Sequence, residues 1–494
     1  MMKHFMTGLR MAGYLLCSVF VQSAAAQVGP DIIVKLEGFA HTGRLGPIGE
    51  GIIGAAIGTT ACNSGDEPTN WFQLPDTDHP VFPSNFYRLM TIEGSSRFEQ
   101  IGQSWVKHGF ATEDEDECGF GCTPPQIPMF QLGVGCSDTY MSGLARIACD
   151  LSPRSAFHPY TGVMAFGGNL GPSGECEGRS VNFPSRDHRG HNHNAVSHMN
   201  QIRDVDLMAG LNPGARYFGE SQYIVPHEYV DGNGNQNDNV VYREYRVTGP
   251  NANGLYFFPH VGESVPQEPA LNVWPGATKS LIEPAPLEDG QAFLAYEATD
   301  LGDGIWHYEY ALYNMNLDRA LESLTIPIGS GATLSNVSFH APLNQPHVTH
   351  ADNYSNDPWD VSIGSGAITW ATESFAANYL ANAVTWGTLY NFRFDANAPP
   401  QAVSATVGLF KTGDTTIVAA VGPSAVGARD CNTNGIDDAC DLSCDPPGCT
   451  VPGCGQSDDC TGNGLPDECE ADCDGNGVAD RCELASGTSE DCNT

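Results

Sequence analysis

Three copies of one short pattern near the end of the chain repeat oxygen-bearing side chains at a fixed spacing. Positions 1, 3, 5, 9 and 12 of the copies are occupied by Asp430, Asn432, Asn434, Asp438 and Asp441, by Asp459, Thr461, Asn463, Asp467 and Glu470, and by Asp472, Asp474, Asn476, Asp480 and Glu483. Calcium takes about six to eight oxygen ligands in flexible geometry, and loops with this ligand spacing hold it in many proteins. The pattern therefore predicts three calcium-binding loops, with calcium as the cofactor.

A glycine follows the fifth position of each copy, at Gly435, Gly464 and Gly477, where the chain must turn sharply between ligands. Cysteines stand at positions 2 and 11 of every copy. The tail has almost no large apolar residues, so only calcium and disulfides could order it. Pro466 lies inside the second copy, and the third copy begins at Asp472, only thirteen residues after the start of the second at Asp459. This spacing leaves no room for the paired helices of an EF-hand.

A second group of candidate ligands consists of the histidines His188, His191 and His193, with His198 following them. Neutral imidazole nitrogens bind zinc or copper, and a His-x-His pair on a strand would place His191 and His193 on one face. The alternative is a polar, solvated loop without a metal. Signatures of hydrolases and phosphate-binding loops are absent from the chain, so no catalytic residue is assigned.

The first 26 residues are typical of a secretory signal peptide. Lys3 and Arg10 accompany an apolar stretch that is too short to span a membrane, and Ala24–Ala26 precede the expected cleavage site. Loss of this segment changes the formal net charge from −37 to −39. So acidic a chain does not neutralise phosphates, which excludes nucleic acid as a general partner. No membrane span is expected, and the expected location is extracellular or at the cell surface.

The cysteines divide the remaining chain. Sixteen remain after residue 26, with six in Cys62–Cys176 and ten in Cys431–Cys492. An even number in an exported chain predicts disulfides, and their pairing is not determined by the sequence. We expect a disulfide-containing, loop-rich N-terminal domain over residues 27–245, because this region is rich in glycine, proline and asparagine. We expect acidic, cysteine-rich calcium repeats over residues 426–494.

The region between them, residues 246–425, has the pattern of short antiparallel strands. In Trp306–Asn314 the residues Trp306, Tyr308, Tyr310 and Leu312 fall on one face, and Val384–Phe394 alternates in the same way. Many short strands with aromatic inward faces and no long helix predict an antiparallel β-sandwich. The predicted fold is mainly β, with this sandwich at the centre, a disulfide-held region before it and an irregular tail after it.

The tail resembles the Asp-Cys-Asn-x-Asn-Gly repeats near the C-termini of exported proteins of planctomycete-type bacteria. It is also similar to thrombospondin type 3 repeats and, more loosely, to dockerin calcium loops. A dockerin pairs each loop with a helix, and the proline- and glycine-rich stretch Cys444–Cys454 cannot form one. The planctomycete-type proteins have no assigned activity, so the resemblance implies export and calcium binding rather than a reaction.

Two classes of function remain open from the sequence. The first is an exported calcium-binding surface or matrix protein with a structural or adhesive role, whose partner is a surface or matrix polymer or another exported protein. The second is an exported metal-dependent or polysaccharide-active enzyme, with His188, His191 and His193 at its centre and the tail as an anchor. The absence of hydrolase signatures favours the first class.

Overall fold

The computed structural model describes most of the chain. The described residues are 29–72, 76–143, 151–164, 194–230, 235–344, 354–364, 366–425, 430–432, 434–445, 449–460, 462, 466–470, 472 and 479–486. Several predictions lie outside these ranges, namely those for the signal peptide 1–26, for His188, His191 and His193, and for Thr461, Asn463, Asp474 and Asn476.

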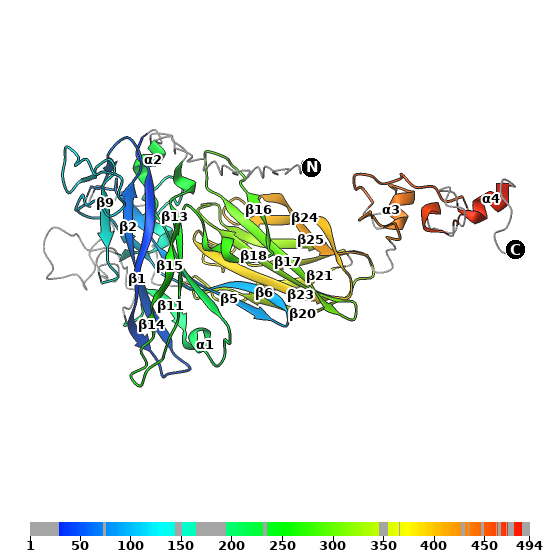
Figure 1. Ribbon diagram of the computed structural model, residues 1–494, viewed down its shortest axis with the longest axis horizontal. Coiled ribbons are helices and arrows are strands. Elements are labelled where there is room, and N and C mark those ends of the chain that lie inside the picture. Colours follow the sequence, from blue (N-terminus) through cyan, green and yellow to red (C-terminus); the bar gives the residue numbers. More distant parts are fainter. Residues whose placement is uncertain are drawn as a thin grey trace, which may run out of the picture.

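Two five-stranded antiparallel sheets form the N-terminal half (Figure 1). In the first sheet the order is β11 (Asn200–Arg203), β2 (Ile52–Asn63), β1 (Ile32–Leu45) and β14 (Phe257–Phe258), with β9 (Ser137–Tyr140) also paired to β2. In the second sheet the order is β15 (His260–Pro266), β13 (Val240–Tyr245), β12 (Arg216–Gln222), β5 (Ser84–Ile92) and β6 (Ser95–Gln103).

Two further five-stranded antiparallel sheets form the next part of the chain. In the third sheet the order is β16 (Thr278–Ile282), β17 (Ala292–Gly302), β18 (Ile305–Asn314), β23 (Thr388–Ala396) and β20 (Leu334–His340). In the fourth sheet the order is β21 (Asp360–Ile363), β22 (Ala367–Ala371), β19 (Leu321–Pro327), β24 (Pro400–Leu409) and β25 (Thr415–Pro423).

The remaining elements are short. Two small sheets pair β3 (Thr69–Asn70) with β8 (Gln131–Leu132), and β10 (Leu151–Ser152) and β4 (Val81–Phe82) with β7 (Val106–His108). The helical segments are η2 (Arg154–Ala156), α1 (Asp204–Leu207), α2 (Pro226–Val230), η4 (Asn235–Asn237), η5 (Ala270–Val273), α3 (Asp438–Leu442), η6 (Asp467–Cys469) and α4 (Asp480–Ser486). Within the described part of the chain, every helix is too short or too polar to cross a bilayer.

The four large sheets pack face to face in one stack, which Figure 1 shows running from β1 and β2 to β24 and β25. One apolar core lies between the first and second sheets, and another lies between the third and fourth. A third core joins the second sheet to the third, so both faces of β18 are buried. Tyr308 and Tyr310 point toward the fourth sheet, while Ala311 and Tyr313 point toward the second.

A chain of opposite charges crosses the contact between the second and third sheets. Glu309 on β18 accepts hydrogen bonds from Nε of Arg97 at 2.9 Å and from Nε of Arg393 at 3.0 Å. Arg393 also donates through Nη2 to Glu99 at 2.8 Å, and Glu99 accepts from Arg88 at 2.7 Å. All five side chains are mostly or fully buried. The two sandwiches are therefore joined by paired charges as well as by apolar packing.

This network makes stability depend on pH. Burial alone would raise the pKa of Glu99, but the charges of His340, Arg393 and Arg88 outweigh burial and hold that pKa far below the ordinary value of 4.5. A lowered folded-state pKa stabilises the fold above the ordinary value, and this contribution is lost as the pH falls. We expect stability to fall below about pH 4.5 in the wild type and to fall less steeply in Glu99→Gln. Chemical denaturation in steps of about one pH unit between pH 2.5 and 7 measures this dependence. The control Glu263→Gln changes an exposed position and should keep the wild-type slope.

The prediction of a mainly antiparallel β protein with a central sandwich is confirmed. In the N-terminal region, disulfides Cys62–Cys118 and Cys122–Cys136 hold the loops after β7. The same region also contributes strands to two large sheets, which its glycine-rich sequence did not predict. Strands β14 and β15 follow residue 245 and still belong to these N-terminal sheets.

Candidate functional site

The first repeat of the tail folds into a tight loop around its aspartates and amides. The carboxylate of Asp430, at position 1, accepts hydrogen bonds from the backbone N–H groups of Asn434 at 3.0 Å and Gly435 at 2.9 Å. Gly435 has a φ of +84°, a left-handed conformation that glycine adopts without a steric penalty. The sharp turn expected at position 6 is therefore present.

Asp441, at position 12, gathers the side chains of positions 3 and 5. Its two carboxylate oxygens accept hydrogen bonds from the amides of Asn432 at 3.1 Å and Asn434 at 3.0 Å. Asp441 is buried and comes from α3, which begins at position 9 of the repeat. A half-turn of either amide would present its oxygen in place of its nitrogen. The predicted ligands at positions 3, 5 and 12 are thus linked by side-chain hydrogen bonds, and Asp430 is held by the backbone of the same loop.

Asp438, at position 9, carries a carboxylate oxygen that lacks a donor. Its Oδ1 accepts from the backbone N–H of Cys431 at 2.9 Å, whereas its Oδ2 is buried without a hydrogen-bond partner. Burial raises the pKa of Asp438, and the neighbouring charges of Asp437, Asp441 and Asp430 raise it further. A buried carboxylate is costly unless a donor or a cation pairs with it. The orphaned oxygen therefore fits a bound cation.

Sulfur ligands are excluded at this position. Cys431 and Cys469 lie close to the Asp438 carboxylate, but they are joined to each other in a disulfide. A disulfide sulfur is not the thiolate that binds zinc or copper. The donor set that remains consists of oxygens, which suits a hard cation such as calcium.

The second and third repeats share parts of this geometry. The Oδ1 of Asp467 accepts from the backbone N–H of Cys460 at 3.0 Å, which reproduces the contact between positions 9 and 2 of the first repeat. Helical segments begin at Asp467 and at Asp480, again at position 9. Each repeat of the otherwise irregular tail therefore ends in a short helical segment. The structure also describes Asp459, Glu470, Asp472 and Glu483, and each of them has an interaction partner.

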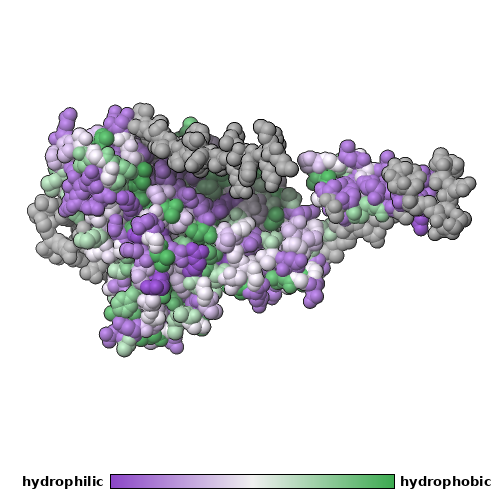
Figure 2. Space-filling model, viewed as in Figure 1, coloured by the Kyte–Doolittle hydropathy of each residue, from purple (hydrophilic) through white to green (hydrophobic). Residues whose placement is uncertain are grey.

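The disulfides connect one repeat to the next. Cys431, at position 2 of the first repeat, pairs with Cys469, at position 11 of the second. Cys460, at position 2 of the second, pairs with Cys482, at position 11 of the third. Asn432 also donates to Glu468 at 3.0 Å, across the same pair of repeats. Figure 2 shows a mainly hydrophilic surface on the described part of this tail, and disulfides and polar hydrogen bonds join its repeats.

The histidine cluster cannot be placed, since His188, His191 and His193 lie outside the described residues. His198, which follows them, is described. It is buried, and its ring packs edge-on against Trp105 with the ring centres 4.0 Å apart.

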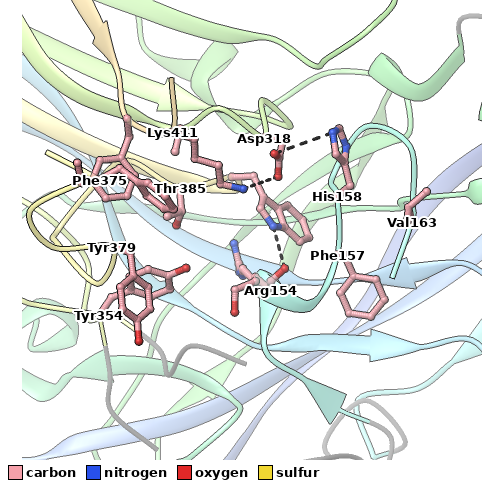
Figure 3. Close-up of a pocket in the computed structure, with 15 residues that line it drawn as sticks. Arg154, Phe157, His158, Val163, Asp318, Tyr354, Phe375, Tyr379, Thr385 and Lys411 are labelled. Carbon is pink, nitrogen blue, oxygen red and sulfur yellow. Dashed lines mark hydrogen bonds and ion pairs between the residues drawn. The ribbon is translucent and has the colours of Figure 1, made fainter. Parts of the chain in front are cut away.

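The structure contains a second candidate site that the sequence did not predict. It is an aromatic pocket where the N-terminal half meets loops of the third and fourth sheets. Its volume is about 870 Å³. Phe375 and Tyr379 lie on its exposed rim, and Asp318 and Lys411 form part of its polar wall (Figure 3). The available signal was weak, namely the three aromatic residues Phe375, Tyr379 and Trp386 in the segment between β22 and β23.

These features define a disulfide-bonded, antiparallel β protein, and disulfides of this number are typical of oxidising compartments. No protein-family model matches the chain, and no curated protein matches it. Among solved structures, a serine-rich repeat adhesion glycoprotein from Streptococcus agalactiae aligns over 76% of this chain and 89% of its own, with 9% identity and a TM-score of 0.18. A TM-score this low supports no conclusion about fold or function.

Proposed function

We propose that this protein is an exported calcium-binding protein of the cell surface or extracellular matrix, with a structural or adhesive role. The observation that carries the proposal is the first repeat of the tail. There the amides of Asn432 and Asn434 donate to the carboxylate of Asp441. Asp430 accepts from the backbone of the same loop, and Asp438 has a buried oxygen without a donor, which supports a cation site.

Calcium would supply the positive charge that this loop lacks. The charges of Asp437, Asp441 and Asp430 all act on the carboxyl of Asp438 and help to raise its pKa. Like charges at this density repel each other, and a divalent cation offsets that repulsion. The same ligand spacing recurs in the other two repeats, so we extend the proposal to three ions along the tail.

A structural role follows from how the tail is held together. The repeats have little apolar surface to bury, and their disulfides run from each repeat to the next. Binding energy at such a site becomes folding energy, because the ligands are not arranged in the unfolded chain. The tail would then act as a calcium-stiffened segment beside a rigid stack of sheets, suited to attachment to a surface polymer or another exported protein.

The test uses the purified full chain and its Asp441→Asn variant. We expect titration calorimetry to show calcium binding by the wild type, and about tenfold or greater weakening of one class of sites in the variant, because position 12 supplies a central ligand. Asp445→Asn removes the same charge at an exposed position outside the ligand set, and it should bind calcium as the wild type does. Limited proteolysis with EDTA should cleave the tail and spare the sheets.

Two results would refute the proposal. One is an absence of calcium binding in the titration. The other is a tail that resists protease equally with calcium and with EDTA, because calcium would then contribute nothing to its order.

A further inference from the structure

The aromatic pocket has a rigid floor. Trp386 and Phe410 are buried beneath it, and the indole Nε1 of Trp386 donates to the backbone carbonyl of Arg154 at 3.0 Å. The Arg154 guanidinium lies 5.7 Å from the Trp386 ring and donates to the carbonyls of Ser104 and Gly387. Burial lowers the pKa of Arg154 to about 10, so it remains charged at neutral pH. These contacts fix the floor before any ligand arrives.

The rim of the pocket exposes aromatic rings to solvent. Phe375 is 41% exposed and Tyr379 is 37% exposed, and both lie on the same side of the cavity in Figure 3. The Phe375 ring rests edge-on against Phe410, with the ring centres 5.2 Å apart. Val163 adds a third exposed apolar side chain to the same cavity. Exposed apolar groups gathered around one hollow are typical of a binding site.

One wall of the pocket is polar and offers both donors and acceptors. Asp318 accepts from Nζ of Lys411 at 2.7 Å, and Nε2 of His158 lies 4.0 Å from its other carboxylate oxygen. Figure 3 shows Asp318 between the two basic side chains. Nδ1 of His158 faces the backbone N–H groups of Tyr160 and Thr161, so Nε2 is the nitrogen that carries the proton in a neutral ring.

We propose that this pocket binds a short, neutral oligosaccharide. A sugar ring has C–H faces that pack on aromatic rings and hydroxyl edges that both donate and accept hydrogen bonds, so it matches both kinds of wall. A purely apolar ligand would bury the Asp318–Lys411 pair and would not replace the hydrogen bonds that water makes to it. An anion gains little from Lys411, because Asp318 already pairs with that charge. The cavity volume lies within the range of about 300–1,000 Å³ that is usual for small-ligand sites.

This site goes beyond the calcium-binding role proposed above, because none of its residues belongs to the tail. The two proposals can therefore fail independently. Sugar binding that persists in EDTA supports a site in the sheet stack, and sugar binding that EDTA abolishes contradicts it.

The test is titration calorimetry of the full chain with short malto-, cello- and chito-oligosaccharides. We expect at least one series to bind, and Phe375→Ala and Tyr379→Ala each to weaken it about tenfold through loss of a ring contact. Phe120→Ala removes a similarly exposed ring that is not part of the pocket lining and should leave the affinity unchanged. Thermal melts of each variant establish that the stack remains folded.

The Lys411→Met variant distinguishes a sugar ligand from an apolar ligand. Loss of the ammonium donor should weaken sugar binding about tenfold, whereas an apolar ligand would bind the variant as well as or better than the wild type. Three results would overturn the proposal: no binding in any of the three series, equal binding by the wild type and both ring variants, or a hydrophobic peptide that binds the pocket where the sugars do not.

Discussion

Replacement of Glu309 by alanine is expected to lower the free energy of unfolding of the sheet stack by about 3–5 kcal/mol. Glu309 is fully buried on β18, at the contact between the second and third sheets. Its carboxylate pairs with Arg97 and Arg393, and Nε2 of His307 lies 3.2 Å from it. Alanine would leave two mostly buried guanidinium groups without this counter-charge, and unpaired buried charge is what makes such a loss severe.

The effect should reach beyond the local contact because the charges are linked. Arg393 also binds Glu99, and Glu99 binds Arg88. Arg97, Glu99 and Arg88 come from the second sheet, whereas Arg393 and Glu309 come from the third. We therefore expect the variant to loosen the contact between the two sandwiches. A shallower denaturant transition, as two halves that unfold separately produce, would report this.

The matched control is Glu244→Ala. Glu244 pairs with Arg216 at 2.6 Å, but the Arg216 side chain is 53% exposed. Ion pairs on the surface contribute about 0–1 kcal/mol, so this variant should remain near the wild type. Chemical denaturation followed by tryptophan fluorescence measures both variants. Equal stability losses in the two would show that the buried network does not hold the sandwiches together.

The buried charge network could not be predicted from the sequence, and strand β18 shows why. The alternation in residues 306–314 correctly predicts strand β18 and the inward face of Tyr308 and Tyr310. The opposite face carries Glu309, which looks like an ordinary solvent-facing residue in a half-buried strand. Its partner Arg97 stands 212 positions away in sequence. A polar residue that faces water and one that is paired across an interface have the same pattern, so periodicity cannot separate them.

The N-terminal sheets were missed for a different reason. Strand β2, with sequence IIGAAIGTTACN, is buried along almost its whole length, so it has no alternation of apolar and polar residues. Its glycines resemble loop residues in sequence, yet they allow close approach of the backbone. A Cβ atom at Gly54 would lie 2.9 Å from Cα of Val196, and one at Gly58 would lie 2.8 Å from the backbone N of Ser142. Glycine at these positions reflects tight packing rather than a turn.

The two candidate sites differ in how close together their residues lie in the sequence. The ligand positions of the first repeat, from Asp430 to Asp441, lie within twelve residues, so the spacing alone predicts which side chains gather. The aromatic pocket combines His158, Asp318, Phe375 and Lys411 from separate segments. Only the packing of the N-terminal half against the later sheets brings them together. The disulfide pairing likewise required the structure, because ten cysteines allow many connectivities.

The double replacement Cys431→Ser and Cys469→Ser is expected to unfold the start of the tail even when calcium is present. This disulfide spans 38 positions and joins the first repeat to the second. Removal of a native disulfide from a small, poorly cored segment typically costs about 2–5 kcal/mol. The tail has little buried apolar surface to offset that loss, so calcium binding alone would have to order the two repeats. We expect protease cleavage between them and calcium affinity lower by about tenfold or more.

The matched control is the double replacement Cys444→Ser and Cys454→Ser. That disulfide closes a stretch of 10 positions between the first and second repeats and joins neither ligand set to the other. A cross-link between repeats restrains calcium loops, whereas this one restrains only the connecting segment, so the control should keep most of its calcium affinity. Calcium titration and proteolysis of both variants give the comparison. Equal losses would mean that the tail needs every disulfide for general compactness, and that the link from position 2 to position 11 has no special part in ordering the calcium loops.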